Sequence, residues 1–388
     1  MIDRILTKSI DTYLKDFPAV AILGPRQVGK TTLVKKIKLK KKIVYLDLEK
    51  QSDFALLKNN AEDFLMSNSS CCVIIDEVQR MPELFPLLRA LIDDDRKPAR
   101  FILTGSASPD LIKGVSESLA GRIIYTYLHP INAKELTDKT SISKHWLRGG
   151  FPNYLLAKNP TSSLDWMDSF ITTYIEKDLP FLFDIKFSSV TMRKLWTMLA
   201  HLSGEILNIE DLARSLDISG TTVKRYLDYL EAAFIINRLP AFFINTGKRL
   251  VKAPKVYLSD TGIVNYLLGI EQNSSLLTYP KAGNLWETYI VNQLYRCKHN
   301  RQDLHFYRTH SGAEVDIVIA RGHMIKALVE IKLSKAPQPT KGLFIAMQDL
   351  DCKNVYIIGN VTDEYELQKG IKVVNIKIFL DKYFHKLF

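Results

Sequence analysis

The stretch Gly24-Pro25-Arg26-Gln27-Val28-Gly29-Lys30-Thr31 decides the fold of the first part of this chain. It matches the pattern G-x-x-x-x-G-K-[ST], whose glycines let consecutive backbone N–H groups turn toward a phosphate. An apolar run at 19–23 precedes the pattern and predicts a buried strand, and a periodic segment at 32–37 follows it and predicts a helix. Strand, glycine loop and helix in this order favour a phosphate-binding loop over an accidental glycine turn.

The loop predicts a site for ATP and Mg²⁺. We expect Lys30 to neutralise the β- and γ-phosphate oxygens, and the Thr31 hydroxyl to bind the metal ion. The N-terminus of the following helix adds partial positive charge. The predicted nucleotide-binding residues are Gly24, Pro25, Arg26, Gln27, Val28, Gly29, Lys30, Thr31, Thr32 and Ser106.

A second apolar run, Val73-Ile74-Ile75, ends in the carboxylates of Asp76 and Glu77. Such a run is typical of a buried parallel strand that reaches the ligand-binding edge of its sheet. We expect Asp76 to hold Mg²⁺ through water, and Glu77 to act as the general base toward the attacking water. A strand that ends in a solvated acidic turn is the alternative. A third strand, 100–103, ends in Thr104-Gly105-Ser106, where a small hydroxyl could sense the γ-phosphate.

These segments occur in the order GPRQVGKTT (24–32), DEVQR (76–80), LTGSAS (103–108) and LAGR (119–122). In this order the first third of the chain resembles AAA-type P-loop ATPases of bacteria and archaea, in which a C-terminal domain of uncharacterised function follows. The resemblance implies ATP binding and hydrolysis, and assembly into a homo-oligomer. It also makes Arg122 a candidate catalytic arginine finger or nucleotide sensor, with an ordinary surface arginine as the alternative.

Composition limits the class of protein. With 388 residues, 46% of them hydrophobic, the chain has room for two or three domains with proper cores. A formal charge of +11 favours an acidic polymer, DNA or RNA, or an anionic surface as partner, and a protein that is merely basic is the alternative. The cysteines predict small buried side chains in a reduced compartment, since none forms a C-x-x-C pair: Cys71, Cys72, Cys297 and Cys352. No signal peptide is recognised and no apolar run approaches the ~18 residues of a membrane helix, so we expect a cytoplasmic protein with no membrane partner.

Residues 190–258 have the spacing of a winged helix-turn-helix. Apolar stripes at 209–216 and 223–230 indicate its two helices, with Ser219 as the N-cap of the second. A strand at 242–245, a turn at Thr246-Gly247 and a strand ending at Leu258 would form the wing. DNA phosphate contacts are expected from Lys224 and Arg225 on the helix and from Lys248, Arg249, Lys252 and Lys255 on the wing. A winged helix that packs between domains or binds protein is the alternative.

A lysine cluster closes the helix after the phosphate loop: Lys35, Lys36, Lys38, Lys40, Lys41 and Lys42. Cations suit a helix C-terminus and a solvated face, which is the favoured interpretation. Contact with nucleic acid is the alternative.

Two further strands are predicted at 314–319 and 327–333, with a turn at 321–323 between them. A hairpin centred on this turn places Asp316 opposite Glu330. The Cβ atoms of such a pair lie ~5 Å apart, and a one-residue slip of the register would separate them.

The same register places Glu314 opposite Lys332, and Lys332 shares a face with Glu330 because strands have period two. Two carboxylates and a lysine can bind Mg²⁺ or Mn²⁺ and activate a water molecule. The order D…E-x-K, with an upstream helical glutamate, resembles the PD-(D/E)xK nuclease superfamily. The resemblance implies Asp316 and Glu330 as metal ligands, Lys332 as the catalytic lysine and Glu287, in a helix at 284–295, as an auxiliary acid. A surface ion pair across the strands is the alternative.

We therefore expect an α/β protein with four segments: an AAA-type P-loop ATPase core at 1–136, a helical lid or linker at 137–189, a winged helix-turn-helix at 190–258 and a restriction-nuclease-like α/β domain at 259–388. The first functional hypothesis is an ATP-regulated, metal-dependent nuclease that acts on DNA. The second is a nucleotide-controlled DNA- or protein-binding switch with an inactive nuclease fold. The third is an ATPase that interacts only with proteins.

Overall fold

The computed structural model describes residues 2–108, 119, 121–138, 140–243, 250–368 and 370–388. The chain divides into two compact units. The N-terminal unit comprises Met1–Ile131, Ser169–Phe187 and Leu227–Ile235. The C-terminal unit comprises Asn132–Asp168, Ser188–Tyr226 and Ile236–Phe388.

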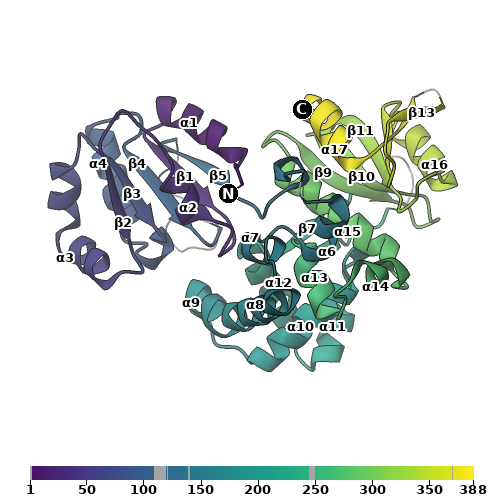
Figure 1. The fold of residues 1–388 in the computed structure, drawn as a ribbon, viewed down its shortest axis with the longest axis horizontal. Coiled ribbons are helices and arrows are strands. Elements are labelled where there is room, and N and C mark those ends of the chain that lie inside the picture. The colour runs from purple at the N-terminus through teal and green to yellow at the C-terminus, as the bar shows by residue number, and fades with distance from the viewer. Residues whose placement is uncertain (1, 109–118, 120, 139, 244–249, 369) are drawn as a thin grey trace. The chain divides into compact units, whose positions relative to one another are not determined.

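The N-terminal unit is built on a parallel sheet with the strand order β2-β3-β4-β1-β5 (Figure 1). Every residue of β1, β3 and β4 is buried, as expected for strands covered on both faces. The strands are β1 (Ala19–Leu23), β2 (Ile43–Asp47), β3 (Cys72–Asp76), β4 (Phe101–Gly105) and β5 (Ile123–Tyr127). The helices are α1 (Leu6–Asp16), α2 (Lys30–Val34), α3 (Gln51–Ser67), η1 (Val78–Arg80), α4 (Leu84–Asp94), η4 (Tyr174–Asp178) and α9 (Leu179–Phe183).

The strand order positions the residues that the sequence singled out. Strand β4 lies between β1 and β3, so its carboxyl end separates the phosphate loop after β1 from the acidic pair after β3. The strand predicted at 19–23 is confirmed with the same bounds. The helix predicted at 32–37 begins earlier, at Lys30, because Gly29 already adopts a left-handed conformation (φ 97°) as its N-cap. It ends at Val34.

The first part of the C-terminal unit combines helices with a small antiparallel sheet of order β6-β8-β7. Its strands are β6 (Glu205–Ile206), β7 (Ile236–Leu239) and β8 (Lys255–Leu258). Its helices are η3 (Ala133–Glu135), α6 (Ile142–Arg148), α7 (Pro152–Leu155), α10 (Ser189–His201), α11 (Ile209–Leu216), α13 (Thr261–Leu267) and α14 (Asn273–Thr278). Helices α8 (Pro160–Thr173) and α12 (Gly220–Ala232) contain residues of both units.

Two predictions about this region are corrected or refined. The strand that pairs with β8 is Ile236–Leu239, directly after α12, and not the segment beginning at Phe242. Ser219 is confirmed as an N-cap, because its Oγ accepts a hydrogen bond of 3.1 Å from the N–H of Thr222. The predicted turn at 246–247 lies outside the described residues.

The rest of the C-terminal unit is a mixed sheet of order β13-β14-β12-β11-β10-β9. Its strands are β9 (Asp303–Arg308), β10 (Glu314–Arg321), β11 (Met324–Ile331), β12 (Val355–Ile358), β13 (Tyr365–Gln368) and β14 (Ile371–Val374). Its helices are α15 (Ala282–Cys297), α16 (Lys341–Asp349), α17 (Ile376–Ile378), η5 (Phe379–Tyr383) and η6 (Phe384–Lys386).

The register predicted for the hairpin of β10 and β11 holds, although its turn is shorter than expected. Ile317 pairs with Val329, as a hairpin centred on residue 323 requires. Next to the turn, however, Arg321 pairs with Met324, one residue out of that register. A bulge between Ile319 and Ala320 absorbs the difference.

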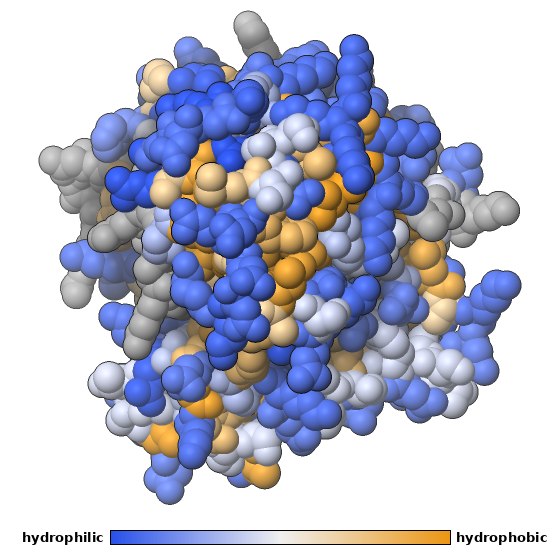
Figure 2. Space-filling model, turned by 90° about the vertical axis from the view of Figure 1, so that its left-hand side faces the viewer, coloured by the Kyte–Doolittle hydropathy of each residue, from blue (hydrophilic) through white to orange (hydrophobic). Residues whose placement is uncertain are grey.

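Hydrophilic side chains cover most of the face shown in Figure 2, and hydrophobic ones gather there in smaller groups. Exposed large hydrophobic residues of the N-terminal unit, such as Ile5, Met66 and Phe181, are far apart in the sequence. Within the described ranges, no helix is both long and apolar enough to cross a membrane.

Candidate functional site

The phosphate loop curls tightly against its own unit. Gly24 has φ 151°, and a Cβ atom at this position would lie 2.1 Å from the backbone oxygen of Leu128. Gln27 adopts a left-handed conformation (φ 62°) although it is not a glycine. Such strained positions persist where the surrounding structure fixes them, and they concentrate at functional sites.

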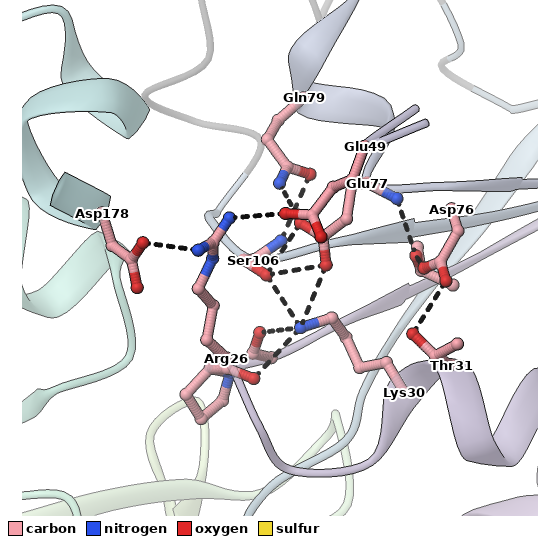
Figure 3. A network of polar contacts seen from close by, with 12 residues as sticks. Arg26, Lys30, Thr31, Glu49, Asp76, Glu77, Gln79, Ser106 and Asp178 are labelled. Carbon is pink, nitrogen blue, oxygen red and sulfur yellow. Dashed lines mark hydrogen bonds and ion pairs between the residues drawn. The ribbon is translucent and has the colours of Figure 1, made fainter. Parts of the chain in front are cut away.

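The Lys30 ammonium lies at the centre of a polar network (Figure 3). It donates to the backbone oxygens of Gly24 and Pro25, at 3.0 Å each, and to Ser106 Oγ at 2.8 Å. The side chain is buried, with 4% of its surface exposed, and burial lowers the pKa of Lys30. Glu77, 3.9 Å away, opposes this lowering. The three ammonium protons are therefore satisfied within the protein, and Lys30 has to exchange partners to reach a phosphate.

The Asp76 carboxylate, at the end of β3, accepts hydrogen bonds from three hydroxyl groups. Thr31 Oγ1 donates to its Oδ2 at 2.7 Å and the Tyr45 hydroxyl to the same atom at 2.5 Å, while Thr104 donates to Oδ1. Asp76 is buried. The Thr31 hydroxyl and the Asp76 carboxylate thus lie side by side as hard oxygen donors, the kind of ligand that Mg²⁺ prefers.

Glu77 is fixed by both its backbone and its side chain. Its backbone is left-handed (φ 59°), and its N–H donates to Thr104 Oγ1 at 3.0 Å. Ser106 Oγ donates to its carboxylate at 3.1 Å, and Gln79 Nε2 donates to the same group (Figure 3). The carboxylate is thereby aimed toward Lys30, in a position where it can polarise a water molecule.

Arg26 of the phosphate loop is held by two acids. Its guanidinium donates to Asp178 at 2.5 Å and to Glu49 at 3.0 Å (Figure 3). Burial raises the pKa of Asp178 to about 6, although the charge of Arg26 acts in the opposite direction. The loop arginine is thus tied to a segment of the N-terminal unit that lies far from it in the sequence.

The other predicted residues occupy different surroundings. Arg122 forms a bidentate ion pair with Asp93, near the end of α4, at 2.6 and 2.8 Å. Thr32, in the first turn of α2, is exposed. Lys224 and Arg225 are exposed on α12. Lys248 and Arg249 lie outside the described residues.

A second cluster, here called the carboxylate cluster, consists of Glu287, Glu314 and Asp316 with Lys255 between them. The Lys255 Nζ atom lies 2.9 Å from Glu287, 2.8 Å from Glu314 and 3.9 Å from Asp316. Lys255 is 3% exposed. The expectation that it contacts DNA from the wing is therefore wrong. The side chain points into the protein because β8 places it beside these acids.

The charges of the cluster depend on one another. Burial by itself would lower the pKa of Lys255, but the surrounding carboxylates more than offset this and raise it. Burial and the nearby Glu287 raise the pKa of Asp316 to about 7, while Lys255 acts in the opposite direction. The Tyr257 hydroxyl donates to Glu287 at 2.7 Å, and burial raises the pKa of Tyr257. Lys255 is the counter-ion of this cluster.

The residues predicted as a nuclease site lie at the same end of the sheet but make different contacts. Lys332 forms an ion pair of 2.9 Å with Glu330, which is 3% exposed. Asp316 Oδ2 accepts a hydrogen bond of 2.7 Å from the N–H of Ile331. In the part of the chain that the structure describes, no group of three or more His, Cys, Asp and Glu residues is arranged to hold a metal ion. A lysine inside the cluster does not fit a bound Mg²⁺ or Mn²⁺.

Sequence reasoning missed several residues that complete these sites. Gln79 belongs to the DEVQR segment, so this motif itself contained the signal for it. Nothing in the local sequence distinguishes Tyr45 or Asp178. Lys255 stands in a basic segment that also suits a solvated wing.

Comparison with known proteins adds the family. Residues 16–137 match the model of an AAA domain, and 139–274 and 282–379 match two domains of unknown function, DUF8612 and DUF4143. The uncharacterized protein Rv2008c of Mycobacterium tuberculosis is 38% identical over 342 residues, which cover 88% of this chain and 76% of that protein. The chain belongs to this family of AAA-domain proteins.

More distantly similar proteins occur in archaea. The uncharacterized protein MJ1544 of Methanocaldococcus jannaschii is 22% identical over 384 residues, which cover 91% of this chain and 84% of that protein. Among solved structures, the Walker-type ATPase PABY2304 of Pyrococcus abyssi matches with a TM-score of 0.49 and 14% identity, over 69% of this chain and 96% of that chain.

Proposed function

We propose that this protein is a nucleotide-controlled switch that hydrolyses ATP in its N-terminal unit and binds DNA through its C-terminal unit. The observation that carries the proposal is the position of Glu77, whose carboxylate is held by Ser106 and aimed toward the P-loop lysine Lys30. A base fixed beside the phosphate-binding lysine is what phosphoryl transfer to water requires.

The residues divide the work of hydrolysis in a simple way. Thr31 and Asp76 would hold Mg²⁺, which neutralises charge on the phosphate oxygens when bound. Lys30 exchanges its bonds with the loop carbonyls for bonds to the phosphates. Glu77 orients the attacking water and accepts its proton. Ser106 now bridges Lys30 and Glu77, so it is placed to respond to a γ-phosphate that arrives between them.

Binding of DNA is supported by charge and by the order of elements. The chain carries a formal charge of +11. The succession α10, β6, α11, α12, β7 and β8, with β8 between the other two strands, supports a winged helix-turn-helix. Lys224 and Arg225 are exposed on its second helix, where they can reach phosphates.

The remaining part of the C-terminal unit supports a nuclease-like fold that binds and does not cut. The succession α15, β9, β10, β11, α16 and β12 supports this fold. Lys255 lies among Glu287, Glu314 and Asp316, which favours the switch over the nuclease hypothesis. The competing hypothesis, an ATP-regulated nuclease, draws on the approach of Asp316, Glu330 and Lys332 at one sheet end, and it requires Lys255 to leave the cluster.

The proposal is tested with three forms of the full chain: wild type, Lys30→Ala and Glu77→Gln. We expect Lys30→Ala to lose ATP binding, and Glu77→Gln to bind ATP but turn it over slowly. DNA affinity, measured by fluorescence anisotropy, should differ between the ATP-locked Glu77→Gln form and wild type with ADP. Equal affinity in both nucleotide states would refute the switch, and no DNA binding at low salt would leave an ATPase that acts on proteins.

A cleavage assay separates the switch from the nuclease. Single-stranded, duplex and branched DNA are incubated with Mg²⁺ or Mn²⁺, with and without ATP. We expect no cleavage by wild type. Cleavage that disappears in Asp316→Ala would establish the nuclease hypothesis instead.

A further inference from the structure

An open pocket of about 970 Å³ lies in the N-terminal unit, and it is distinct from the nucleotide site. It is lined by α1, by the segment after α2 and by the segment before β4. Pockets for small molecules usually measure roughly 300 to 1,000 Å³, so this one has room for an extended chain segment. We call it the lysine pocket, after the lysines that line it: Lys15, Lys36, Lys38, Lys40, Lys41 and Lys97.

The lysine pocket has an unbalanced charge. Asp11 is the acid among its described lining residues. Lys97 is neutralised by an ion pair of 2.8 Å with Asp95, and Lys41 donates to the backbone oxygen of Pro98 at 2.7 Å. The other lysines are exposed and have no ion pair with any acid in the described part of the chain: Lys15, Lys36, Lys38 and Lys40.

The floor of the pocket is apolar, with Leu14, Ile37 and Leu39 among its lining residues. Lysines above an apolar floor match a ligand that alternates anionic groups with flat apolar surfaces. A single-stranded nucleic acid has this character, because its phosphates are charged and its unpaired bases are free to contact apolar side chains. In a duplex the faces of the bases are stacked inside, and only their edges and the sugar–phosphate backbone reach the protein.

The pocket is connected to the nucleotide site through α2. This helix begins at Lys30 of the phosphate loop, and the chain reaches Lys36 of the pocket directly after its end. The next strand, β2, contains Tyr45, whose hydroxyl donates a hydrogen bond to Asp76. The segment 35–42 therefore joins the lysine pocket to two parts of the nucleotide site, Lys30 at the start of α2 and Tyr45 beside Asp76.

We infer that the lysine pocket binds the phosphate backbone of a single-stranded nucleic acid and that this binding stimulates ATP hydrolysis. The inference rests on the proposed ATPase and DNA-binding function and adds a second contact site, on the ATPase unit itself. The four lysines without an ion pair are the main contacts.

The test uses a variant in which Lys15, Lys36, Lys38 and Lys40 are replaced by Gln in the full chain. The matched control replaces four exposed lysines elsewhere, so that the net charge changes equally: Lys158, Lys186, Lys353 and Lys386. Binding of labelled single-stranded DNA, RNA and duplex DNA is measured by anisotropy over a range of salt concentrations. ATP turnover is measured with and without each nucleic acid, and turnover without it verifies that the variants are folded.

We expect the pocket variant to lose at least tenfold in affinity for single strands, while the control stays within threefold of wild type. The slope of log affinity against log salt should become shallower by roughly 3, since each single-strand phosphate contact contributes about 0.7. Stimulation of ATP turnover should disappear, with the basal rate retained. DNA and RNA losing affinity equally would support a backbone contact without sugar selectivity.

Three results would overturn the inference. The first is a pocket variant that binds single strands like wild type while a Lys224→Ala, Arg225→Ala variant binds them weakly. The proposed function would then be supported, and the lysine pocket would be rejected as a nucleic-acid site. The second is an equal loss for duplex DNA, which would remove the single-strand assignment. The third is displacement of single strands by poly-glutamate of the same charge at the same concentration, which would indicate an acidic peptide as the occupant. Failure of wild type to bind any nucleic acid at low salt would instead reject the proposed function.

Discussion

Replacing Lys255 by Met removes the cation from the carboxylate cluster while keeping the length of the side chain. In wild type the ammonium lies 2.8 Å from Glu314, 2.9 Å from Glu287 and 3.9 Å from Asp316. The variant leaves these acids together without a counter-ion. Breaking a buried pair by removal of one partner costs about 3 to 5 kcal/mol, because the remaining charge is desolvated and unpaired.

The magnitude follows from two opposing terms. At an effective dielectric constant of about 20, each contact at 3 to 4 Å contributes roughly 4 to 6 kcal/mol of attraction, and desolvation of the charges offsets most of the sum. The variant can also relax, since Glu314 is partly exposed and Asp316 can take up a proton. We therefore expect a loss of about 4 kcal/mol at pH 8.

The sign of the pH dependence follows from the carboxylates. The pKa of Asp316 is already raised from 3.8 to about 7, and loss of Lys255 raises it further. A raised carboxyl pKa makes the folded state less stable as the pH rises from the unfolded value toward the folded value. The deficit of the variant relative to wild type should be smaller near pH 5 than above pH 7, although the lost contacts with Glu287 and Glu314 leave part of it at pH 5.

The assay is thermal unfolding of the full chain between pH 5 and pH 8, with and without Mn²⁺. The control is Lys281→Met, which removes an exposed ion pair with Glu205 and should cost less than about 1 kcal/mol at every pH. Mn²⁺ should stabilise Lys255→Met more than it stabilises wild type, since only in the variant do the acids of the carboxylate cluster lack a cation. Equal melting temperatures for Lys255→Met and wild type across this pH range would refute the role of Lys255 as counter-ion.

Three further predictions concern other parts of the chain. Glu77→Gln should slow ATP hydrolysis by a factor of about 10² to 10⁴ and keep ATP binding, and normal turnover would remove Glu77 as the base. Gly149→Ala should destabilise the fold by about 3 kcal/mol or more, because the residue has φ 63° and a Cβ atom would lie 1.8 Å from Asp260 Oδ1. The control Gly283→Ala has no atom within 4 Å of the new Cβ and should be tolerated, so equal denaturation midpoints for the two variants would contradict this reasoning. Asp178, whose pKa is raised from 3.8 to about 6, should make wild type lose on the order of 2 kcal/mol between pH 4 and pH 6. Asp178→Asn should flatten that fall, and an unchanged slope in denaturant titrations would show that Asp178 is not its source.

Local patterns were sufficient where function depends on neighbouring residues. The phosphate loop and the pair Asp76 and Glu77 were predicted because each is a short strand followed directly by its polar residues. The pairing of β10 with β11 was predicted because a hairpin joins segments that are close in sequence. The bulge after Ile319 was not predicted, since a two-residue turn and a longer one leave the same apolar pattern.

Contacts between distant segments could not be predicted in the same way. Arg26 was expected at the nucleotide, and it is held by Glu49 and Asp178. Lys255 was expected on a solvated wing, and it is buried because acids from α15 and β10 surround it. A charged side chain is buried only where partners compensate its desolvation, and those partners are contributed by other elements.

The sequence by itself determined that the chain has a phosphate loop, an acidic strand end and a basic overall charge, because these properties reside in adjacent residues or in composition. The tertiary structure decided which groups meet. It placed Ser106 between Lys30 and Glu77 by inserting β4 into the sheet, and it placed Lys255 inside the carboxylate cluster. The physical reason is that strand order and side-chain burial arise from packing the whole chain, whereas a motif is fixed by the geometry of a few consecutive peptide units.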